Sequence, residues 1–254
     1  MVNPVNMSKS RAALTHIWPT LLVLGLITGL VLFVWYPYPF RQFGESGKFA
    51  LLLIFSAAFT GPFLTWLVYS KGKRGLVLDL WIIALIQLAA IAWGTFSLYQ
   101  NRPFFLVFTV DRFEVLSKRD VDLSWITEPK FLDKPFVGPI LLYANMPSDP
   151  AAYQKFLNEV MFEGKPDLQF RPEYWSLYAE RQQLVLHESR SLEALLEARL
   201  DSSHEIDKLV KDNGGDIHQL QFVPAMLKNG PFAVILNAQT GKVIDTLVID
   251  PWLK

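Results

Sequence analysis

Residues 76–99 read LVLDLWIIALIQLAAIAWGTFSLY, and this run decides the class of the protein. It is apolar except at Asp79, near its start, and Gln87, in its middle. A helix needs about 20 apolar residues to cross the hydrocarbon core of a bilayer. The run exceeds that length, so it predicts a transmembrane helix.

Two similar runs precede it, at residues 17–36 and 49–69, and neither contains a charged residue. Three runs of this length make a buried soluble helix the weaker alternative. A cleaved signal peptide is also weaker, because the first run exceeds the usual length of about 7–15 apolar residues and ends in Trp35-Tyr36-Pro37 rather than in small residues. Amphipathic rings prefer the membrane interface, and such rings lie near the ends of the runs at Trp18, Trp35, Tyr36, Tyr38, Trp66, Tyr69, Trp81 and Tyr99.

Composition and charge agree with a chain that is only partly in the membrane. Hydrophobic residues make up 51% of the chain, and its mean hydropathy is +0.24. Residues 1–102 hold eight of the 24 basic residues and two of the 24 acidic ones, so residues 103–254 have a net charge of −6. A net-acidic soluble part disfavours nucleic acid as a partner. The absence of cysteine excludes disulfides, thiolate metal sites and thiol chemistry.

The distribution of basic residues predicts the orientation. Two basic residues precede the first run and three lie between the second and third, in both places without an acidic residue: Lys9, Arg11, Lys71, Lys73 and Arg74. Cytoplasmic flanks carry the excess of Lys and Arg. We therefore expect a multi-pass protein of the bacterial inner membrane, with a membrane domain at 1–102, a cytoplasmic N-terminus and a periplasmic domain at 103–254.

Residues 103–254 alternate strand-like and helical patterns. Strands are predicted at 104–110 and 113–115, and a terminal hairpin at 232–236 and 243–249, with 219–222 beside it. Helices are predicted at 150–161, capped by Asp149, and at 173–186, 191–199 and 203–211. The expected fold class is a membrane protein with three transmembrane α-helices, followed by a soluble α+β domain with a small antiparallel sheet and helices against one face.

The search for catalytic chemistry finds no motif. The four histidines, His16, His187, His204 and His218, lack the spacing of a metal site. No nucleophile elbow, phosphate-binding loop or dinucleotide fingerprint occurs. We therefore expect no catalytic residues, no cofactor and no metal, and the chain is predicted not to be an enzyme.

Polar or helix-bending residues inside the predicted spans are candidates for contact with a partner helix. Asp79 can pair with the nearby Lys73 and Arg74 or contact a partner helix. Gln87 can form a hydrogen bond across helices. Gly61-Pro62 removes a backbone hydrogen bond in the second span, which predicts a kink that serves packing or opens a groove.

Two segments of the soluble domain are weaker candidates. Asp111-Arg112-Phe113 is more typical of turn and sheet packing than of a contact site. Asp250-Pro251-Trp252 can form a docking edge, although a buried tryptophan that closes the domain is the simpler interpretation.

A set of short segments, in the same order and with the same three-span layout, carries a resemblance to a known family. The segments are Phe33–Pro37, Gly61–Thr65, Lys71–Leu76, Asp79-Leu80, Ala84–Ala90, Tyr99–Pro103, Val107-Phe108, Asp111–Phe113, Ala238–Val243 and Asp250–Trp252. They resemble the type IV pilin accessory family, the TfpX/TfpZ and FimB-like proteins. The likeness covers about residues 30–115 and 230–254. Ser56–Thr60 departs from it, because we associate an acidic residue with the segment before Gly-Pro.

The resemblance implies a non-catalytic accessory factor that assists pilin stability or assembly at the inner membrane. Its partners would be a type IV pilin, foremost the major pilin, and the lipid bilayer. A pilin is held in the membrane by a long apolar N-terminal helix, and the three spans could pack against that helix. Two alternatives remain: a helper or enzyme of pilin modification, and a membrane-anchored ligand sensor. The candidate partner contacts are Gly61, Pro62, Asp79, Gln87, Asp111, Arg112, Phe113, Asp250 and Trp252.

Overall fold

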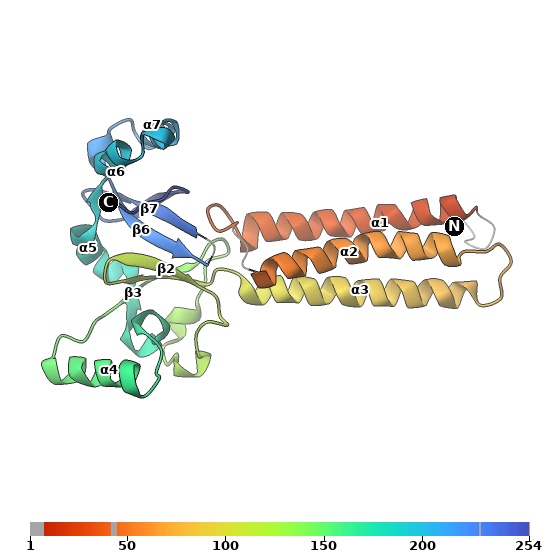
Figure 1. Cartoon of the computed structure of the whole chain (residues 1–254), viewed down its shortest axis with the longest axis horizontal. Helices are drawn as coiled ribbons and strands as arrows, with labels where there is room; N and C mark the ends of the chain where they lie inside the picture. The colour runs from red at the N-terminus through yellow and green to blue at the C-terminus, as the bar shows by residue number, and fades with distance from the viewer. Residues whose placement is uncertain (1–7, 42–44, 229, 254) are drawn as a thin grey trace. The chain divides into compact units, whose positions relative to one another are not determined.

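A computed structural model of the chain describes residues 8–41, 45–228 and 230–253, and these form two compact units. The membrane unit contains residues 8–35 and 45–101 and consists of three long helices. The sheet unit contains residues 36–41, 102–228 and 230–253 and is built around a β-sheet (Figure 1). Segment 36–41, which the sequence assigns to the membrane domain, thus belongs to the second unit.

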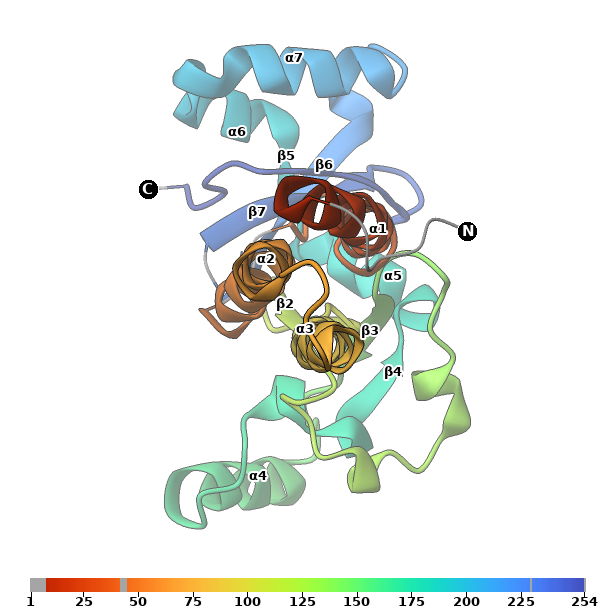
Figure 2. The same cartoon turned by 90° about the vertical axis from the view of Figure 1, so that its right-hand side faces the viewer.

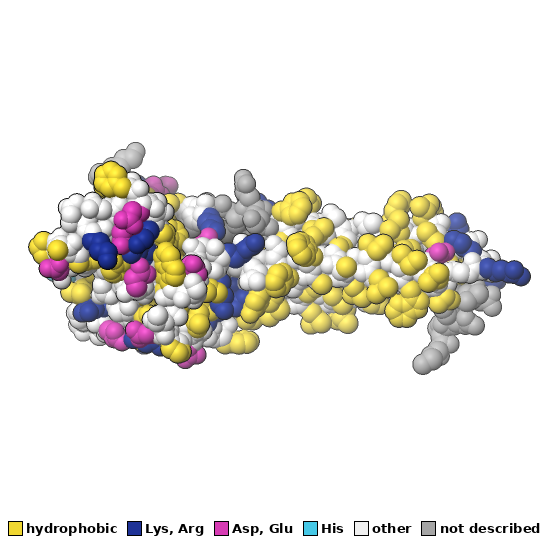
Figure 3. Space-filling model, turned by 90° about the horizontal axis from the view of Figure 1, so that it is seen from below, with side chains coloured by type: hydrophobic (Ala, Val, Ile, Leu, Met, Phe, Trp, Pro, Cys, Tyr) yellow, Lys and Arg dark blue, Asp and Glu magenta, His cyan; other side chains and the backbone are white. Residues whose placement is uncertain are grey.

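The helices of the membrane unit correspond to the three predicted spans. They are α1 (Lys9–Leu30), which continues as a π-helix (Val31–Trp35), α2 (Glu45–Val68) and α3 (Leu76–Asn101). All three are long and apolar enough to cross a membrane, as predicted. Apolar side chains cover their sides (Figure 3). Large rings such as those of Trp18 and Phe59 are 73% and 78% exposed, which suits hydrocarbon better than water.

Helix α2 packs against both other helices (Figure 2). On α3 the buried positions follow one another at intervals of three, four or seven residues: Leu76, Ile83, Gln87, Ile91, Gly94 and Leu98. This spacing puts them on one face of the helix. The Nδ1 atom of His16 on α1 lies 2.7 Å from Oγ1 of Thr65 on α2. The three helices therefore meet along a seam that contains both apolar and polar side chains.

The sheet of the second unit has eight strands in the order β4-β3-β1-β2-β6-β7-β8, with β5 paired to β6. Strands β1 and β3 are parallel, as are β2 and β6, and the other pairs are antiparallel. The predicted small antiparallel sheet was therefore wrong, because the parallel partners lie far apart in sequence. The strands are β1 (Phe105–Thr109), β2 (Arg112–Leu116), β3 (Ile140–Ala144), β4 (Trp175–Leu177), β5 (Arg190–Ser191), β6 (Leu220–Leu227), β7 (Gly230–Asn237) and β8 (Val243–Leu247).

The hairpin at the end of the chain forms as predicted. Strands β7 and β8 pair antiparallel, and Gly241 in their connection has a φ of 70°. A Cβ atom at this position would lie 2.6 Å from the carbonyl oxygen of Gln182, so only glycine fits. The Tyr178 hydroxyl donates a hydrogen bond to the Gly241 carbonyl oxygen. The hairpin loop is thereby fixed to the helix that follows β4.

Four helices surround the sheet: α4 (Pro150–Phe162), α5 (Tyr178–Glu188), α6 (Leu192–Ala198) and α7 (Ser203–Asp212). The predicted caps are confirmed, since Asp149 accepts from the backbone N–H of Ala152 at 2.9 Å and Ser191 accepts from that of Ala194 at 3.2 Å. Short 3-10 turns complete the unit at Leu123–Trp125, Pro129–Leu132, Leu168–Phe170, Pro172–Tyr174, Leu200–Ser202 and Ile217–Gln219.

The predicted helix at 173–186 was wrong in its first part. Residues 172–174 form a 3-10 turn and 175–177 form β4, and α5 begins only at Tyr178. The Trp175 ring is buried 4.9 Å from the ring of Phe105 on β1. Tertiary packing of this tryptophan at the edge of the sheet therefore overrides the local helical pattern.

Both faces of the sheet are covered, rather than the single face expected. Every residue of β1 is buried. Its alternate residues enter different cores: Leu106 and Phe108 pack with Tyr178 and Val185 of α5, whereas Phe105 and Val107 belong to the core that contains Phe156 of α4. The central strands are therefore held from both sides.

The connection between the first two helices is anchored in the sheet unit. Phe40 is buried, and its ring lies 5.9 Å from that of Phe232 on β7 in an edge-to-face arrangement. The Tyr38 hydroxyl accepts a hydrogen bond from the backbone N–H of Val248 at 3.1 Å. The chain thus enters this unit twice, first through residues 36–41 and again at Arg102.

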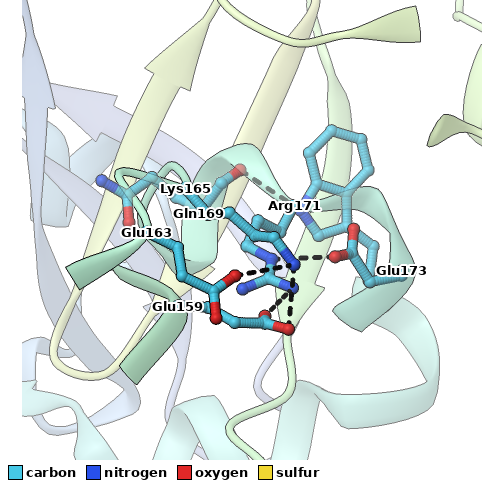
Figure 4. Close-up of polar contacts among 7 residues, drawn as sticks. Glu159, Glu163, Lys165, Gln169, Arg171 and Glu173 are labelled. Atoms are coloured by element: carbon cyan, nitrogen blue, oxygen red, sulfur yellow. Dashed lines mark hydrogen bonds and ion pairs between the residues drawn. The ribbon is translucent and has the colours of Figure 1, made fainter. Parts of the chain in front are cut away.

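Helix α4 is fixed to the turn before β4 by a buried ion-pair cluster (Figure 4). Nη2 of Arg171 lies 2.7 Å from Glu159, and its Nε lies 2.8 Å from Glu173. Nζ of Lys165 lies 2.9 Å from Glu159. The hydrogen bonds from Lys165 and Arg171 lower the pKa of Glu159 below its ordinary value of 4.5. The charged form of Glu159 therefore stabilises the folded state.

We predict that Glu159→Gln destabilises α4 at pH 7, since Lys165 and Arg171 lose their shared carboxylate. The contribution of Glu159 is present above pH 4.5 and is lost as the pH falls through the lower folded-state pKa. The difference between wild type and variant should therefore shrink in acid. Hydrogen exchange of the α4 amides in the full chain, comparing both proteins at each pH, measures this difference.

Glu163→Gln is the matched control. Glu163 lies 3.7 Å from the same lysine, but its side chain is 59% exposed, so screening by water leaves its ion pair little effect on stability. Equal effects of the two substitutions at pH 7 would contradict the assignment of Glu159 as the centre of the cluster.

Candidate functional site

A groove runs between α2 and α3 on the surface of the membrane unit. It has a volume of about 230 Å³, and we call it the small-residue groove because serine, alanine, threonine and glycine form much of its lining. The lining residues are Leu53, Ser56, Ala57, Thr60, Gly61, Leu64, Ile83, Ile86, Gln87 and Ala90. Small residues spaced four apart, as in the exposed Ser56 and Thr60, let a further helix approach closely.

Gly61 and Gln87, both predicted as candidates, meet in this groove. A Cβ atom at Gly61 would lie 1.8 Å from Oε1 of Gln87 and 2.5 Å from its Cδ. The amide therefore occupies the space that the glycine leaves free. A second close approach occurs at Gly94 of α3, where a Cβ would lie 3.0 Å from the backbone oxygen of Ala50 on α2. These two glycines bring the helices together.

Gln87 also reaches the first helix. Its Nε2 donates a hydrogen bond to Oγ1 of Thr20 on α1 at 3.2 Å, and both side chains are buried. The Gln87 side chain, which belongs to α3, thus contacts both α1 and α2. The predicted hydrogen bond of Gln87 across helices is present.

The other two predicted residues of the spans lie apart from this contact. Pro62 is buried next to Gly61, and α2 continues through it to Val68. Asp79 lies in the first turn of α3, where one carboxylate oxygen is 2.7 Å from Nζ of Lys73. The pairing of Asp79 with Lys73 that the sequence suggested is therefore present.

A second groove, which we call the aromatic groove, runs between α1 and α3. Its volume is about 440 Å³, and its lining consists of Ile27, Trp35, Leu88, Ile91, Ala92, Thr95, Phe96 and Tyr99. The rings of Trp35 and Tyr99 lie 5.2 Å apart, edge to face. This groove is wider than the small-residue groove and is rimmed by bulky side chains that keep another helix at a greater distance.

The sheet unit has a cleft of about 550 Å³ beside β2 and β6, which we call the outer cleft. These parallel strands are in register only at Phe113–Ala225 and Glu114–Met226. The cleft is lined by residues from the two strands and from segments far away in the sequence: Arg112, Glu114, Val115, Leu116, Asp120, Phe170, Met226, Leu227, Lys228 and Trp252.

The charges of the outer cleft are paired within it. Nε of Arg112 donates to Glu114 at 2.9 Å, and Nζ of Lys228 donates to Asp120 at 2.7 Å. Burial raises the pKa of Asp120, but hydrogen bonds from Lys228 and Ser117 outweigh that effect and leave the pKa below its ordinary value. The cleft therefore combines apolar walls with fixed charges of both signs.

Arg199 holds Trp252 and the neighbouring Asp250 at the edge of this cleft. Arg199 donates to the carbonyl oxygens of Asp250 and Trp252 at 3.0 and 2.8 Å, and to the Asp250 carboxylate at 2.7 Å. The guanidinium carbon of Arg112 lies 5.8 Å from the centre of the Trp252 ring. The structure thus brings Arg112 and Trp252 together, although the sequence offered them as separate candidates.

The remaining predicted residues of this unit have different places. Asp111 is exposed in the turn between β1 and β2, 3.7 Å from Nη1 of Arg112. Phe113 is fully buried in the core with Phe108 and Tyr178. It presents no surface to a partner, and its place agrees with the interpretation as sheet packing.

Across residues 8–41, 45–228 and 230–253, no three His, Asp or Glu side chains gather as a metal ion would require. Four residues of the small-residue groove were not predicted, although the spacing of small residues could have revealed them: Ser56, Ala57, Thr60 and Ala90. Asp120 and Lys228 were not predicted either, because the fold alone brings them together and no local signal exists.

Comparison with known proteins gives one family. The sequence model of one protein family, described as fimbrial assembly protein FimB, matches residues 6–44. Three curated relatives come from Dichelobacter nodosus: the fimbrial assembly protein of serogroup I is 28% identical over 82% of both chains, that of serogroup E1 is 30% identical over 70% of both chains, and that of serogroups C1 and C2 is 36% identical over 43% of this chain and 85% of its own length. None of the solved structures matches this chain.

We predict that Gly61→Ala destabilises the membrane unit. The new methyl group must displace the Gln87 amide and break its bond to Thr20, a loss of about 1 kcal/mol together with looser packing. Hydrogen exchange of the α2 and α3 amides, measured on the full chain in detergent micelles, reports the change in stability.

Gly25→Ala on α1 is the control, because nothing lies within 4 Å of its added Cβ. Alanine favours a helix over glycine by up to about 1 kcal/mol, so this variant should not destabilise the membrane unit. In the pair Gly61→Ala with Gln87→Ala, the destabilisation should be smaller than the sum of the two single effects. A strictly additive pair would show that the glycine and the amide do not interact.

Proposed function

Because the chain belongs to the FimB family of fimbrial assembly proteins, we propose that it is a non-catalytic accessory factor of type IV pilus biogenesis. It binds a pilin in the inner membrane and keeps the subunit available for assembly. The N-terminus is cytoplasmic and the sheet unit is periplasmic, in accordance with the basic residues that flank the spans.

The small-residue groove is the observation that carries this proposal. In lipid, helices associate through close van der Waals packing and interhelical hydrogen bonds rather than through hydrophobic burial. The groove offers a nearly apolar wall that includes small side chains of α2 and α3. The long apolar helix of a pilin is the kind of partner that such a wall accommodates.

The aromatic groove is the less favourable site for that helix. Its bulky rim of Trp35, Phe96 and Tyr99 limits how closely two backbones can approach. We therefore assign the pilin helix to the small-residue groove.

The outer cleft supplies a second contact in the proposal. A pilin held by its helix carries its headgroup outside the membrane, on the side that we assign to the sheet unit. The cleft presents the Trp252 ring, the apolar side chains of Phe170 and Met226, and paired charges. Aromatic and arginine side chains in such settings often dominate protein–protein contacts.

We predict disulfide crosslinks between the small-residue groove and the apolar helix of pilin. The chain has no cysteine, so Ser56→Cys and Ala90→Cys each introduce a single thiol with little change in volume. With a pilin that carries one cysteine in its helix, both variants should form a mixed disulfide in cells, detected as a pilin-sized shift on a non-reducing gel.

Leu22→Cys and Phe63→Cys are the controls, because these side chains are 66% and 61% exposed and line neither groove. The proposal requires far more crosslinking at the groove positions than at the controls. If only Ala92→Cys formed crosslinks, the pilin helix would be assigned to the aromatic groove instead. Equal crosslinking yields at all positions would contradict a specific contact.

A further inference from the structure

Two basic side chains lie over one buried ring at the start of the sheet unit, and a third basic residue lies within reach of their charge. Nζ of Lys118 lies 4.4 Å from the centre of the Phe104 ring, and the guanidinium carbon of Arg102 lies 5.5 Å from it. The charge of Arg102 also acts on Lys134. We call Arg102, Lys118 and Lys134 the basic cluster.

The two lysines of the basic cluster lack counter-charge. In the described part of the chain neither Lys118 nor Lys134 forms an ion pair, although the unit as a whole is net acidic. Burial and the charge of Arg102 lower the pKa of Lys134. An anion from outside the chain can pair with the charges of the two lysines.

A strongly exposed apolar segment follows the cluster directly. Phe136 and Val137 follow Lys134 closely in the sequence. Their side chains are 82% and 47% exposed. A phenylalanine that finds no place in a core is unfavourable in water but suits the boundary between headgroups and acyl chains. Lysines beside an exposed ring are the combination by which peripheral segments bind anionic membranes.

Chain connectivity keeps the cluster near the end of a span. Arg102 follows Asn101, the last residue of α3, and consecutive Cα atoms are about 3.8 Å apart. Phe104, around which the cluster forms, is only two residues farther along. The sheet unit also includes residues 36–41, directly after the helix that ends at Trp35. At each of the two points where the chain passes into the sheet unit, it therefore comes directly from the end of a predicted span.

We propose that the basic cluster and the segment Pro135–Val137 form a docking surface for anionic phospholipid headgroups. The lysines bind lipid phosphates, and the Phe136 ring enters the interface. The occupant is the lipid of the bilayer itself rather than an acidic protein segment, because the cluster is adjacent in sequence to a span. The inference rests on the spans crossing a bilayer and does not depend on the pilin contact.

The full chain in lipid nanodiscs tests this surface. Val137→Cys, labelled with a nitroxide, reports contact with the bilayer through its accessibility to oxygen and to a water-soluble nickel complex. In discs rich in phosphatidylglycerol the label should be shielded from the nickel complex, and in discs of phosphatidylcholine it should be far more accessible. High salt should weaken the shielding, because ions screen charges at the surface.

The double variant Lys118→Gln with Lys134→Gln should make the nitroxide label accessible to the nickel complex in phosphatidylglycerol discs. Lys208→Gln with Lys211→Gln removes the same charge from exposed positions of α7 and should leave the label shielded. Equal accessibility in the two lipids, or equal effects of the two double variants, would overturn the proposal. Shielding that appears only when pilin is added would also overturn it and assign the surface to a protein.

Discussion

The contact of Gln87 with Gly61 and Thr20 is the constraint on which the membrane unit depends. Lipid tails are as apolar as the side chains of the helices, so burial alone does not bring spans together. Close packing and interhelical hydrogen bonds must do so. The glycine leaves space on α2, the amide fills it, and its Nε2 reaches α1 at 3.2 Å. A single side chain of α3 thereby contacts both other helices of the unit.

The same contact gives the small-residue groove its shape. Because Gln87 lies against Gly61, the two helices approach closely at this level, and Ser56, Ala57 and Thr60 are left as a shallow wall beside it. A bulkier residue at 61 would displace the Gln87 amide and push the two helices that form this wall apart. In the proposed function the packing that stabilises the spans and the surface that receives pilin are therefore one structure.

The sheet unit is closely packed around its central strands. Strand β1 is buried on both faces, and Arg171 and Glu159 hold α4 to the turn before β4. Phe40, from the connection between the first two helices, is part of the same core as Phe232. A unit with this packing suits the proposed role of presenting a fixed surface to pilin and to the lipid headgroups.

Much of this architecture could be predicted from local sequence. The spans follow from uncharged apolar runs, the start of α4 from Asp149-Pro150, and the terminal hairpin from Gly241, because each signal lies within a few residues. Strand β4 could not be predicted, since Trp175 is placed by the Phe105 ring rather than by its neighbours in sequence. The parallel pairs, β1 with β3 and β2 with β6, depend on long-range register in the same way.

The candidate sites show the same division. Gly61 and Gln87 were recognisable as unusual residues inside apolar runs, and the structure places them in contact. Arg112 and Trp252 were recognisable only separately, because they are far apart in the sequence and the chain between them must fold before they meet. In the basic cluster Arg102 and Lys118 meet at the ring of Phe104, and the charge of Arg102 acts on Lys134, an arrangement for which the sequence holds no motif.

Surface piliation in cells that lack the gene tests the central claim, the role as an assembly accessory, most directly. Total pilin and the mass of the mature subunit are measured in the same cells. The account predicts that pili are lost or strongly reduced while pilin of unchanged mass is still made, and that the gene restores them. Normal piliation would contradict the account, and an altered pilin mass would point to modification instead.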